Sequence, residues 1–189
     1  MRFLPTKLPG VFVVKMELRE DERGLFARSW CQEEFAAQGL DTRLAQCSVS
    51  YNKRRGTLRG MHFQAEPYSE VKLVRCTVGA VYDVAVDLRP ASPTFRQWTA
   101  TELTAENRQA LYVPVGCAHG FQTLTEGAEI LYHMSEFYRA DAARGVRWND
   151  PAFGIRWPVA PPFLSERDAA YPDFSNPDFS NPDFTEAAL

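Results

Sequence analysis

The stretch Leu58–Gln64, LRGMHFQ, carries a cation, a glycine, an imidazole and a terminal amide within strand-like sequence. Strand side chains alternate in direction, so we expect one face to carry Leu58, Gly60, His62 and Gln64, and the other Arg59, Met61 and Phe63. On the first face, Gly60 would leave open space beside His62 where a ligand could approach. The plainer interpretation is a buried histidine satisfied by a backbone partner. The rest of the chain has to decide between these two interpretations.

Most of the chain outside this stretch also has the pattern of short strands. The expected strands are residues 11–18, 43–50, 57–64, 70–78, 81–88, 95–103, 111–113, 119–124 and 128–138. Glycine and proline turns separate them, including a turn at residues 21–24. Within residues 70–78, Lys72 and Val74 are expected to face away from Leu73. About ten short strands at regular spacing predict an all-β jelly roll, either a sandwich or a barrel.

One helix is expected near the N-terminus, at residues 32–38, because good helix formers precede Gly39 there. Ser29, three residues before Gln32, resembles a capping box. Near the C-terminus, PDFSN recurs with a period of five, which matches neither a helix nor a strand, and its prolines block regular hydrogen bonding. We therefore expect one domain over residues 1–170 and a mobile tail over residues 171–189 without catalytic groups.

The composition excludes several classes of protein. A chain of 189 residues with 45% hydrophobic and 24% charged residues is ordinary for one globular domain. A net charge of −3 gives no general attraction to nucleic acid or to anionic membranes. No run has the length of a transmembrane helix, and the first residues lack the apolar stretch of a signal peptide. The four cysteines form no CxxC pair, which favours free thiols in a reducing cytoplasm.

The histidines argue against a metal site. There are three, His62, His119 and His133. A metal-binding cupin usually offers a closely spaced histidine pair, then a glutamate and a distant third histidine, whereas here Gln64 follows His62 at the second position. We therefore expect no metal, and acid–base chemistry at any site around His62.

Other residues of interest each have a bland interpretation as well. Arg23, Arg59 and Lys72 could bind an anionic substrate, but single cations are commonly solvated at the surface. The strand residue Tyr132 could be an acid or a core residue. Asp168 could be a surface carboxylate, or it could orient an imidazole.

Four segments settle the family resemblance. They are QCSVSYNKRRGTLRGMHFQ at residues 46–64, KLVRCTVGAVYDVAVDLRPASPTFRQW at 72–98, LYVPVGCAHGF at 111–121 and WNDPAFGIRWP at 148–158. In this order they resemble the dTDP-4-dehydrorhamnose 3,5-epimerases, over most of residues 1–170. The resemblance implies a metal-free cupin jelly roll in a homodimer, in which the N-terminal strands of one subunit reach the other's site. It also implies a cytoplasmic isomerase of deoxysugar biosynthesis, for cell-surface polysaccharide such as lipopolysaccharide.

The resemblance also implies a mechanism. A 4-keto group acidifies the C3 and C5 hydrogens of the sugar, so that a base gives an enolate and an acid on the opposite face inverts the carbon. The resemblance assigns His62 as the base, oriented by Asp168, and Tyr132 as the inward-facing acid on the opposite side. It places Lys72 at the developing oxyanion, with His119 and Arg59 at the sugar and diphosphate. Gln46 and, from the partner chain, Arg23 would contact the nucleotide. No redox cofactor is needed, and the sequence has no dinucleotide-binding fingerprint.

Several positions depart from the family pattern. Arg28 stands where the family commonly has Glu, Ser48 where it has Asn, Cys117 where it has Phe, Ala143 near a common Glu, and Arg167 where it has Lys. The acid–base residues are kept, while residues such as Arg28, Ser48 and Arg167, on the substrate-binding side, differ. We therefore expect a 4-keto-deoxysugar epimerase whose nucleotide sugar need not be the dTDP-rhamnose precursor, and epimerisation at C3 alone remains open.

Two other classes remain. One is a catalytically silent cupin that binds a nucleotide sugar, against which the retention of both His62 and Tyr132 argues, because binding needs no opposed base and acid. The other is a metal-dependent cupin isomerase or oxygenase, which stoichiometric metal in the purified protein would favour.

Overall fold

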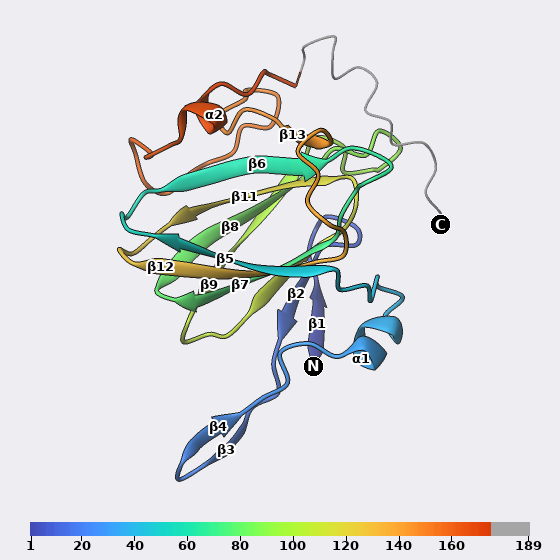
Figure 1. The fold of residues 1–189 in the computed structure, drawn as a ribbon, viewed down its shortest axis with the longest axis vertical. Coiled ribbons are helices and arrows are strands. Elements are labelled where there is room, and N and C mark those ends of the chain that lie inside the picture. Colours follow the sequence, from blue (N-terminus) through green and yellow to red (C-terminus); the bar gives the residue numbers. More distant parts are fainter. Residues whose placement is uncertain (175–189) are drawn as a thin grey trace.

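Two antiparallel sheets pack face to face in this computed structural model, which describes residues 1–174 (Figure 1). The first sheet has the order β1 (Arg2–Pro5), β2 (Phe12–Lys15), β10 (Ala110–Val113), β7 (Lys72–Val78), β12 (Ala128–Met134) and β5 (Gln46–Asn52). The second has the order β13 (Ala143–Gly145), β6 (Leu58–Gln64), β11 (Cys117–Thr123), β8 (Ala80–Asp87) and β9 (Trp98–Thr104). The all-β jelly roll expected from the sequence is confirmed.

The core between the sheets confirms the predicted alternation on β7. Val74 and Cys76 are buried there, in one cluster with Val81 of β8. Leu73, which precedes Val74, belongs to a separate cluster on the outer face with Phe35. The same alternation points Lys72 to the inner face.

Strand β6 does not follow simple alternation. His119 lies opposite His62, and Phe121 lies opposite Arg59, so paired residues are two apart on β11 but three apart on β6. A bulge with one extra residue shifts the direction of the side chains beyond it. Arg59 and His62 therefore both line the space between the sheets, and the prediction that they lie on opposite faces was wrong.

The predicted opening over Gly60 was also wrong. A Cβ atom at this position would lie 2.6 Å from Cα of Gly120 on β11, and φ of Gly60 is +148°. Both conditions favour glycine. Gly60 therefore allows two strands to approach each other closely and leaves no room there for a ligand.

Two short helices are present rather than the one predicted. Helix α1 (Gln32–Ala36) begins after Cys31, which makes no side-chain cap, so the proposed cap by Ser29 lies two residues too early. Helix α2 (Glu166–Ala169) was not predicted; Oγ of Ser165 accepts a hydrogen bond of 3.1 Å from the backbone N–H of Asp168. Neither of these helices, the only ones in residues 1–174, is long and apolar enough to cross a membrane.

The folded body extends beyond the predicted boundary at residue 170. The Phe174 side chain is buried beside Phe153 and Phe95 on the outer face of the second sheet. Tyr171 contacts the His62 ring. Residues 171–174 are therefore not a tail, because apolar burial holds them; the rest of the PDFSN repeat lies outside the described residues.

Replacing Phe174 with alanine is expected to lower the free energy of unfolding by about 3 kcal/mol, because it leaves a cavity in a buried cluster. Urea denaturation would measure the change. Phe163→Ala is the matched control, since Phe163 is exposed, and its cost should stay below about 1 kcal/mol. Equal losses in both variants would contradict the burial of Phe174.

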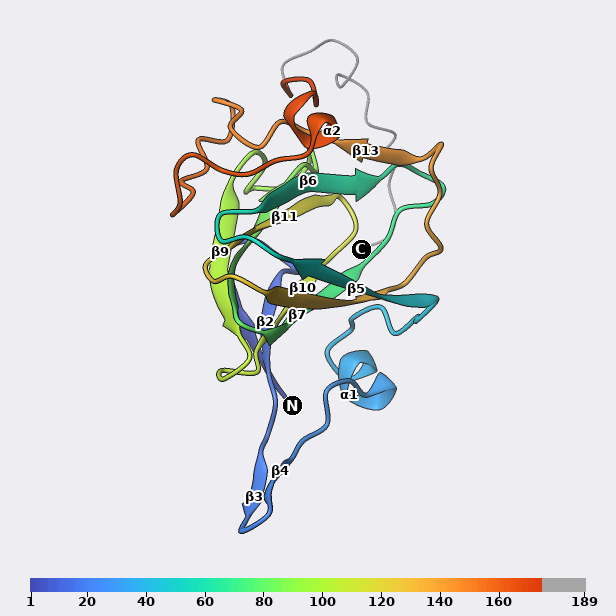
Figure 2. The same ribbon diagram turned by 60° about the vertical axis from the view of Figure 1, so that its left-hand side comes forward.

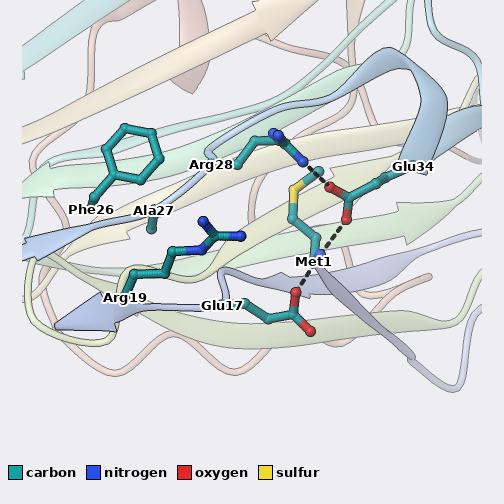
Figure 3. Close-up of a pocket in the computed structure, with 7 residues that line it drawn as sticks. All are labelled: Met1, Glu17, Arg19, Phe26, Ala27, Arg28 and Glu34. Carbon is teal, nitrogen blue, oxygen red and sulfur yellow. Dashed lines mark hydrogen bonds and ion pairs between the residues drawn. The ribbon is translucent and has the colours of Figure 1, made fainter.

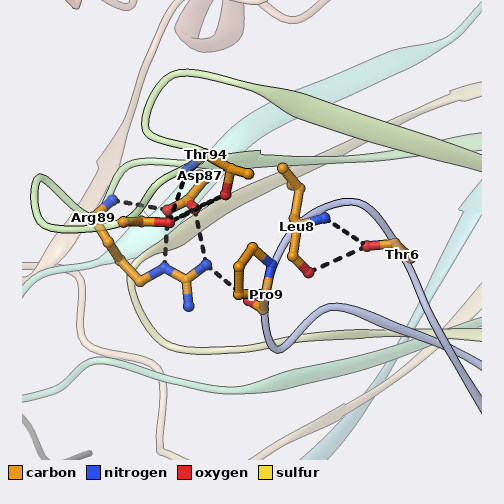
Figure 4. A network of polar contacts seen from close by, with 7 residues as sticks. Thr6, Leu8, Pro9, Asp87, Arg89 and Thr94 are labelled. Carbon is orange, nitrogen blue, oxygen red and sulfur yellow. Dashed lines mark hydrogen bonds and ion pairs between the residues drawn. The ribbon is translucent and has the colours of Figure 1, made fainter.

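The connection between β8 and β9 is held by a buried carboxylate. Asp87 accepts hydrogen bonds from Nε of Arg89 (2.8 Å) and from Oγ1 of Thr94 (2.6 Å), and Nη2 of Arg89 also donates to the carbonyl of Pro9 at 2.8 Å (Figure 4). Burial by itself would raise the pKa of Asp87, but the hydrogen bonds outweigh burial and lower the pKa. This network ties the loop after β8 to the turn between β1 and β2.

Candidate active site

A cavity of about 300 Å³ opens where β6, β7, β12 and β13 meet α2. Four cations and two carboxylates are among its lining residues: Arg59, Lys72, Arg144 and Arg167, with Glu70 and Asp168. His62 lines the same cavity. The excess of positive charge favours an anionic ligand.

His62 and Asp168 form a close pair. Nε2 of His62 lies 2.7 Å from Oδ1 of Asp168, and the carboxylate side chain is 7% exposed, against 38% for the imidazole. Since Nε2 is engaged, Nδ1 is the ring nitrogen left to accept a proton. The carboxylate fixes the tautomer and would make a charge-assisted hydrogen bond to the protonated ring.

A second histidine–carboxylate pair lies deeper between the sheets. Nε2 of His119 contacts Oδ1 of Asp83, and both residues are buried. Asp83 was not predicted as a site residue. The sequence did carry a signal for Asp83, since this carboxylate lies on the inward face of the apolar strand β8. A buried charge needs a partner, so a nearby basic side chain could have been expected.

Tyr132 faces this pair. Its ring lies 6.0 Å from the His119 ring at 85°, and it packs against the inner core cluster. Burial raises the pKa of Tyr132, the Asp83 carboxylate raises it further, and Arg59 opposes the shift. The phenol therefore remains protonated at neutral pH and can donate a proton.

His133 points away from the cavity. It lies beside Tyr132 on β12, opposite Leu73, which belongs to the outer cluster. Burial and the neighbouring Arg75 guanidinium lower the pKa of His133. His133 therefore belongs to the outer face of the first sheet.

Lys72 has a carboxylate partner that sequence reasoning missed. Nζ of Lys72 lies 2.6 Å from Oε1 of Glu70, and the two side chains are 9% and 7% exposed. The signal was present in the sequence, because residues two apart on an extended chain point the same way. The pair holds an ammonium group at a defined place in the cavity wall.

Replacing Glu70 with glutamine is expected to lower the turnover number by about tenfold, or about 1.4 kcal/mol in the barrier. The amide removes the charge that holds Lys72 while keeping nearly the same shape. Steady-state kinetics would measure the change. Glu166→Gln, at the exposed start of α2, is the control. An unchanged turnover number in Glu70→Gln would show that the pairing has no role in catalysis.

The remaining predicted residues divide into two groups. Arg59, with its Nε 2.8 Å from Oδ1 of Asn52, and Arg167 line the cavity. Ser48 lies opposite Tyr132 on the neighbouring strand, and Oε1 of Gln46 accepts a hydrogen bond from the backbone N–H of Tyr138 at 3.1 Å. Gln46 therefore contacts a residue of the cavity wall, whereas Ser48 is not among the lining residues.

Arg23 and Arg28 do not reach the cavity of their own chain. Arg23 lies in the turn between β3 (Arg19–Asp21) and β4 (Gly24–Phe26), a hairpin that projects from the body (Figures 1 and 2), and it pairs with Asp21 at 2.6 Å. Arg28 donates to Glu34 at 3.0 Å, and Glu34 also contacts the amino group of Met1 (Figure 3). The charge of Arg28 is therefore balanced within its own chain, where the sequence suggested a nucleotide contact.

A metal site needs several ligand side chains gathered around one point. Residues 1–174 contain no group of three or more histidine, cysteine, aspartate or glutamate side chains placed to hold an ion. His62 and His119 each engage a carboxylate instead. The site is thus built around two histidine–carboxylate pairs, a phenol and a lysine–glutamate pair.

Known proteins share both the sequence and this architecture. A family profile described as dTDP-4-dehydrorhamnose 3,5-epimerase matches residues 5–176. The dTDP-4-dehydrorhamnose 3,5-epimerase of Salmonella typhimurium is 44% identical over 174 residues, covering 91% of this chain and 94% of the relative.

Two solved structures are also similar. The Bacillus anthracis enzyme of the same name, with TDP and pyrophosphate bound, has a TM-score of 0.88 at 40% identity and covers 91% of this chain and 98% of its own. A 3′-monoepimerase from Streptomyces bikiniensis, in complex with dTDP-quinovose, has a TM-score of 0.83 at 34% identity and covers 89% of this chain and 86% of its own.

Proposed function

Because the chain belongs to the dTDP-4-dehydrorhamnose 3,5-epimerase family, we propose that it epimerises a nucleoside-diphosphate 4-keto-6-deoxysugar at C3 and C5. The observation that carries the proposal is the His62–Asp168 pair, which lines one cavity with Lys72 while the protonated phenol of Tyr132 lies further in between the sheets. A protein that only bound a nucleotide sugar would need no base and acid of this kind.

The reaction follows from these groups. Nδ1 of His62 removes the proton from the carbon beside the ketone, and the electron pair moves to the ketone oxygen to give an enolate. The Lys72 ammonium stabilises the charge on that oxygen. Tyr132 then donates its proton to the opposite face of the carbon, which inverts it. Return of a proton to the phenoxide and loss of the proton from His62 restore the enzyme, so no redox cofactor takes part.

The cavity also fits the nucleotide part of such a substrate. Arg59 and Arg167 supply guanidinium groups, which bind phosphate oxygens in pairs of hydrogen bonds. Tyr138 is an exposed aromatic residue at the cavity wall and offers a face for a nucleobase. Ala143 and Arg144 make this edge more positive than the common family glutamate would, which bears on the choice of nucleotide.

Proton NMR of dTDP-4-keto-6-deoxyglucose incubated with the protein in deuterium oxide tests the proposal. Deuterium entering at both C3 and C5 is the expected result, since each carbon is deprotonated and reprotonated. The absence of exchange with this sugar and with other nucleotide 4-keto sugars would overturn it. Metal analysis of the same sample tests the metal-dependent alternative, for which one metal ion per chain is required.

Epimerisation at C3 alone is the second candidate function. The similarity to a 3′-monoepimerase, at a TM-score of 0.83, supports this candidate. The same NMR experiment separates the two, because this candidate requires deuterium at C3 and none at C5.

The projecting hairpin supports a homodimer. Phe26 is 72% exposed and lies beside exposed Leu25, while the Arg23 side chain at the turn is 89% exposed. Exposed apolar side chains on a hairpin that projects from the body suit an interface. In the dimer, the hairpin of one subunit reaches the cavity of the other and brings Arg23 to the nucleotide.

Mixing two impaired variants tests this arrangement. His62→Asn removes the base from one chain, and Arg23→Glu spoils the nucleotide contact that it gives its partner. A heterodimer of the two has one site with both native residues, so we expect co-expression to restore activity at low substrate concentration. Activity no higher than the sum of the separate variants would contradict a shared site.

The setting of the enzyme follows from the same proposal. The four cysteines are all free, and Cys47 among them is exposed, which suits a reducing compartment such as the cytoplasm. The product would be an activated deoxysugar for cell-surface polysaccharide such as lipopolysaccharide.

A further inference from the structure

The Tyr171 ring lies against the proposed base. Its centroid is 5.7 Å from that of His62, with an angle of 62° between the planes. Gly145 of β13 is paired with His62, and a Cβ atom on Gly145 would lie 2.5 Å from Cζ of Tyr171. Tyr171 therefore fills the place of a side chain at Gly145, on the same face of the sheet as His62.

The hydroxyl end of Tyr171 is also held. Nε of Arg167 donates to the Tyr171 hydroxyl at 3.0 Å, and the guanidinium carbon lies 5.9 Å from the ring centroid. Arg167 directly precedes Asp168, the carboxylate that binds His62. The phenol is thus joined to the helix that orients the base.

The chain after Tyr171 is anchored to the body of the protein. The carbonyl of Pro172 accepts a hydrogen bond of 3.2 Å from the backbone N–H of Arg147, and Arg147 pairs with Asp173 at 2.7 Å. Phe174 follows in its buried cluster. These contacts keep the Tyr171 ring against His62 instead of leaving it free to swing out.

His62 needs a second contact, besides Asp168, to fix the orientation of its ring. The hydrogen bond that Nε2 of His62 donates to Asp168 fixes one ring nitrogen, but the imidazole is 38% exposed and one hydrogen bond leaves the ring free to tilt about it. A base must lie in line with the hydrogen that it removes, and a misplacement of about 1 Å can cost about 100-fold in rate. An aromatic ring packed against the imidazole restricts that tilt.

We propose that Tyr171 is a positioning residue for His62, which sets the plane of the imidazole so that Nδ1 points at the substrate carbon. This role rests on the proposed function, because it requires His62 to be the base. The ring of Tyr171 carries the effect on turnover, whereas its hydroxyl acts on Arg167 and so on substrate binding.

Two substitutions separate these parts. Tyr171→Leu removes both the ring and the hydroxyl, and we expect the turnover number to fall about 10- to 100-fold, with the same rise in KM as in Tyr171→Phe. Tyr171→Phe keeps the ring and is expected to recover most of the turnover number, with a higher KM because Arg167 loses one of its two tyrosine partners, Tyr171 and Tyr138. Phe163→Leu, an exposed aromatic of the same C-terminal segment that lies outside the cavity, is the control.

The imidazole signals of His62 in proton–nitrogen NMR give a readout that does not depend on turnover. Tyr171→Leu should shift or broaden them, while Tyr171→Phe should leave them near those of the wild type. Unchanged signals and turnover in Tyr171→Leu, or equal losses in both variants, would overturn the proposal. If the wild type itself exchanges no deuterium, the proposed function fails, and the imidazole signals still decide whether Tyr171 positions His62.

Discussion

We expect the His62→Asn variant to incorporate deuterium at C3 about 10³-fold more slowly than the wild type, within the range that a general base contributes. The amide cannot accept a proton, yet it can still occupy the place beside Asp168, so the fold should persist. Proton NMR in deuterium oxide with dTDP-4-keto-6-deoxyglucose would follow the exchange, and thermal denaturation would confirm folding.

His133→Asn is the matched control for this experiment. His133 is on the outer face of β12, so its loss removes an imidazole without touching the cavity. Its exchange rate should stay within about twofold of the wild type. Exchange that survived in His62→Asn and vanished in His133→Asn would show that the base is His133 and not His62.

Replacing Tyr132 with phenylalanine is expected to separate exchange from inversion. Formation of the epimerised product should fall about 10²- to 10³-fold, because the enolate loses the acid on the opposite face. Exchange at C3 should continue, since His62 is partly exposed and can trade its proton for deuterium before returning it to the same face. NMR would then show labelled starting sugar in place of labelled product.

Tyr51→Phe serves as the control, because its phenol is exposed on β5 and lies outside the cavity lining. Inversion at the wild-type rate in Tyr132→Phe would remove Tyr132 from the mechanism. Loss of exchange together with inversion would show that the phenol is needed already for proton removal.

Local patterns in the sequence were enough to predict much of this fold. Strand alternation placed Lys72 and Val74 on the face of β7 opposite to Leu73, because each side chain there follows the two-residue period of a regular strand. In the structure Val74 on this face is buried in the core between the sheets. Turn residues likewise predicted the break between β3 and β4. Helix α2 was missed although Ser165 and Asp168 have the spacing of a capping box, because a single turn of helix has no apolar period to reveal it.

Two features of β6 depended on its neighbour in space. The bulge that turns Arg59 to the side of His62 exists because β11 pairs with β6 out of step, which no local pattern encodes. The sequence predicted that Gly60 leaves open space, but the structure shows that a glycine is needed there because Gly120 approaches closely.

The sequence by itself determined the jelly roll and its family, because periodicity and motifs are properties of neighbouring residues. Through the family resemblance it also predicted His62, Tyr132 and Lys72 as site residues. The family resemblance already implied the pairing of Asp168 with His62, but only the tertiary structure decided that Asp83 pairs with His119. It also decided that Tyr171 closes the site instead of starting a tail. Such pairings join residues far apart along the chain, and burial enforces them by making an unpaired charge costly.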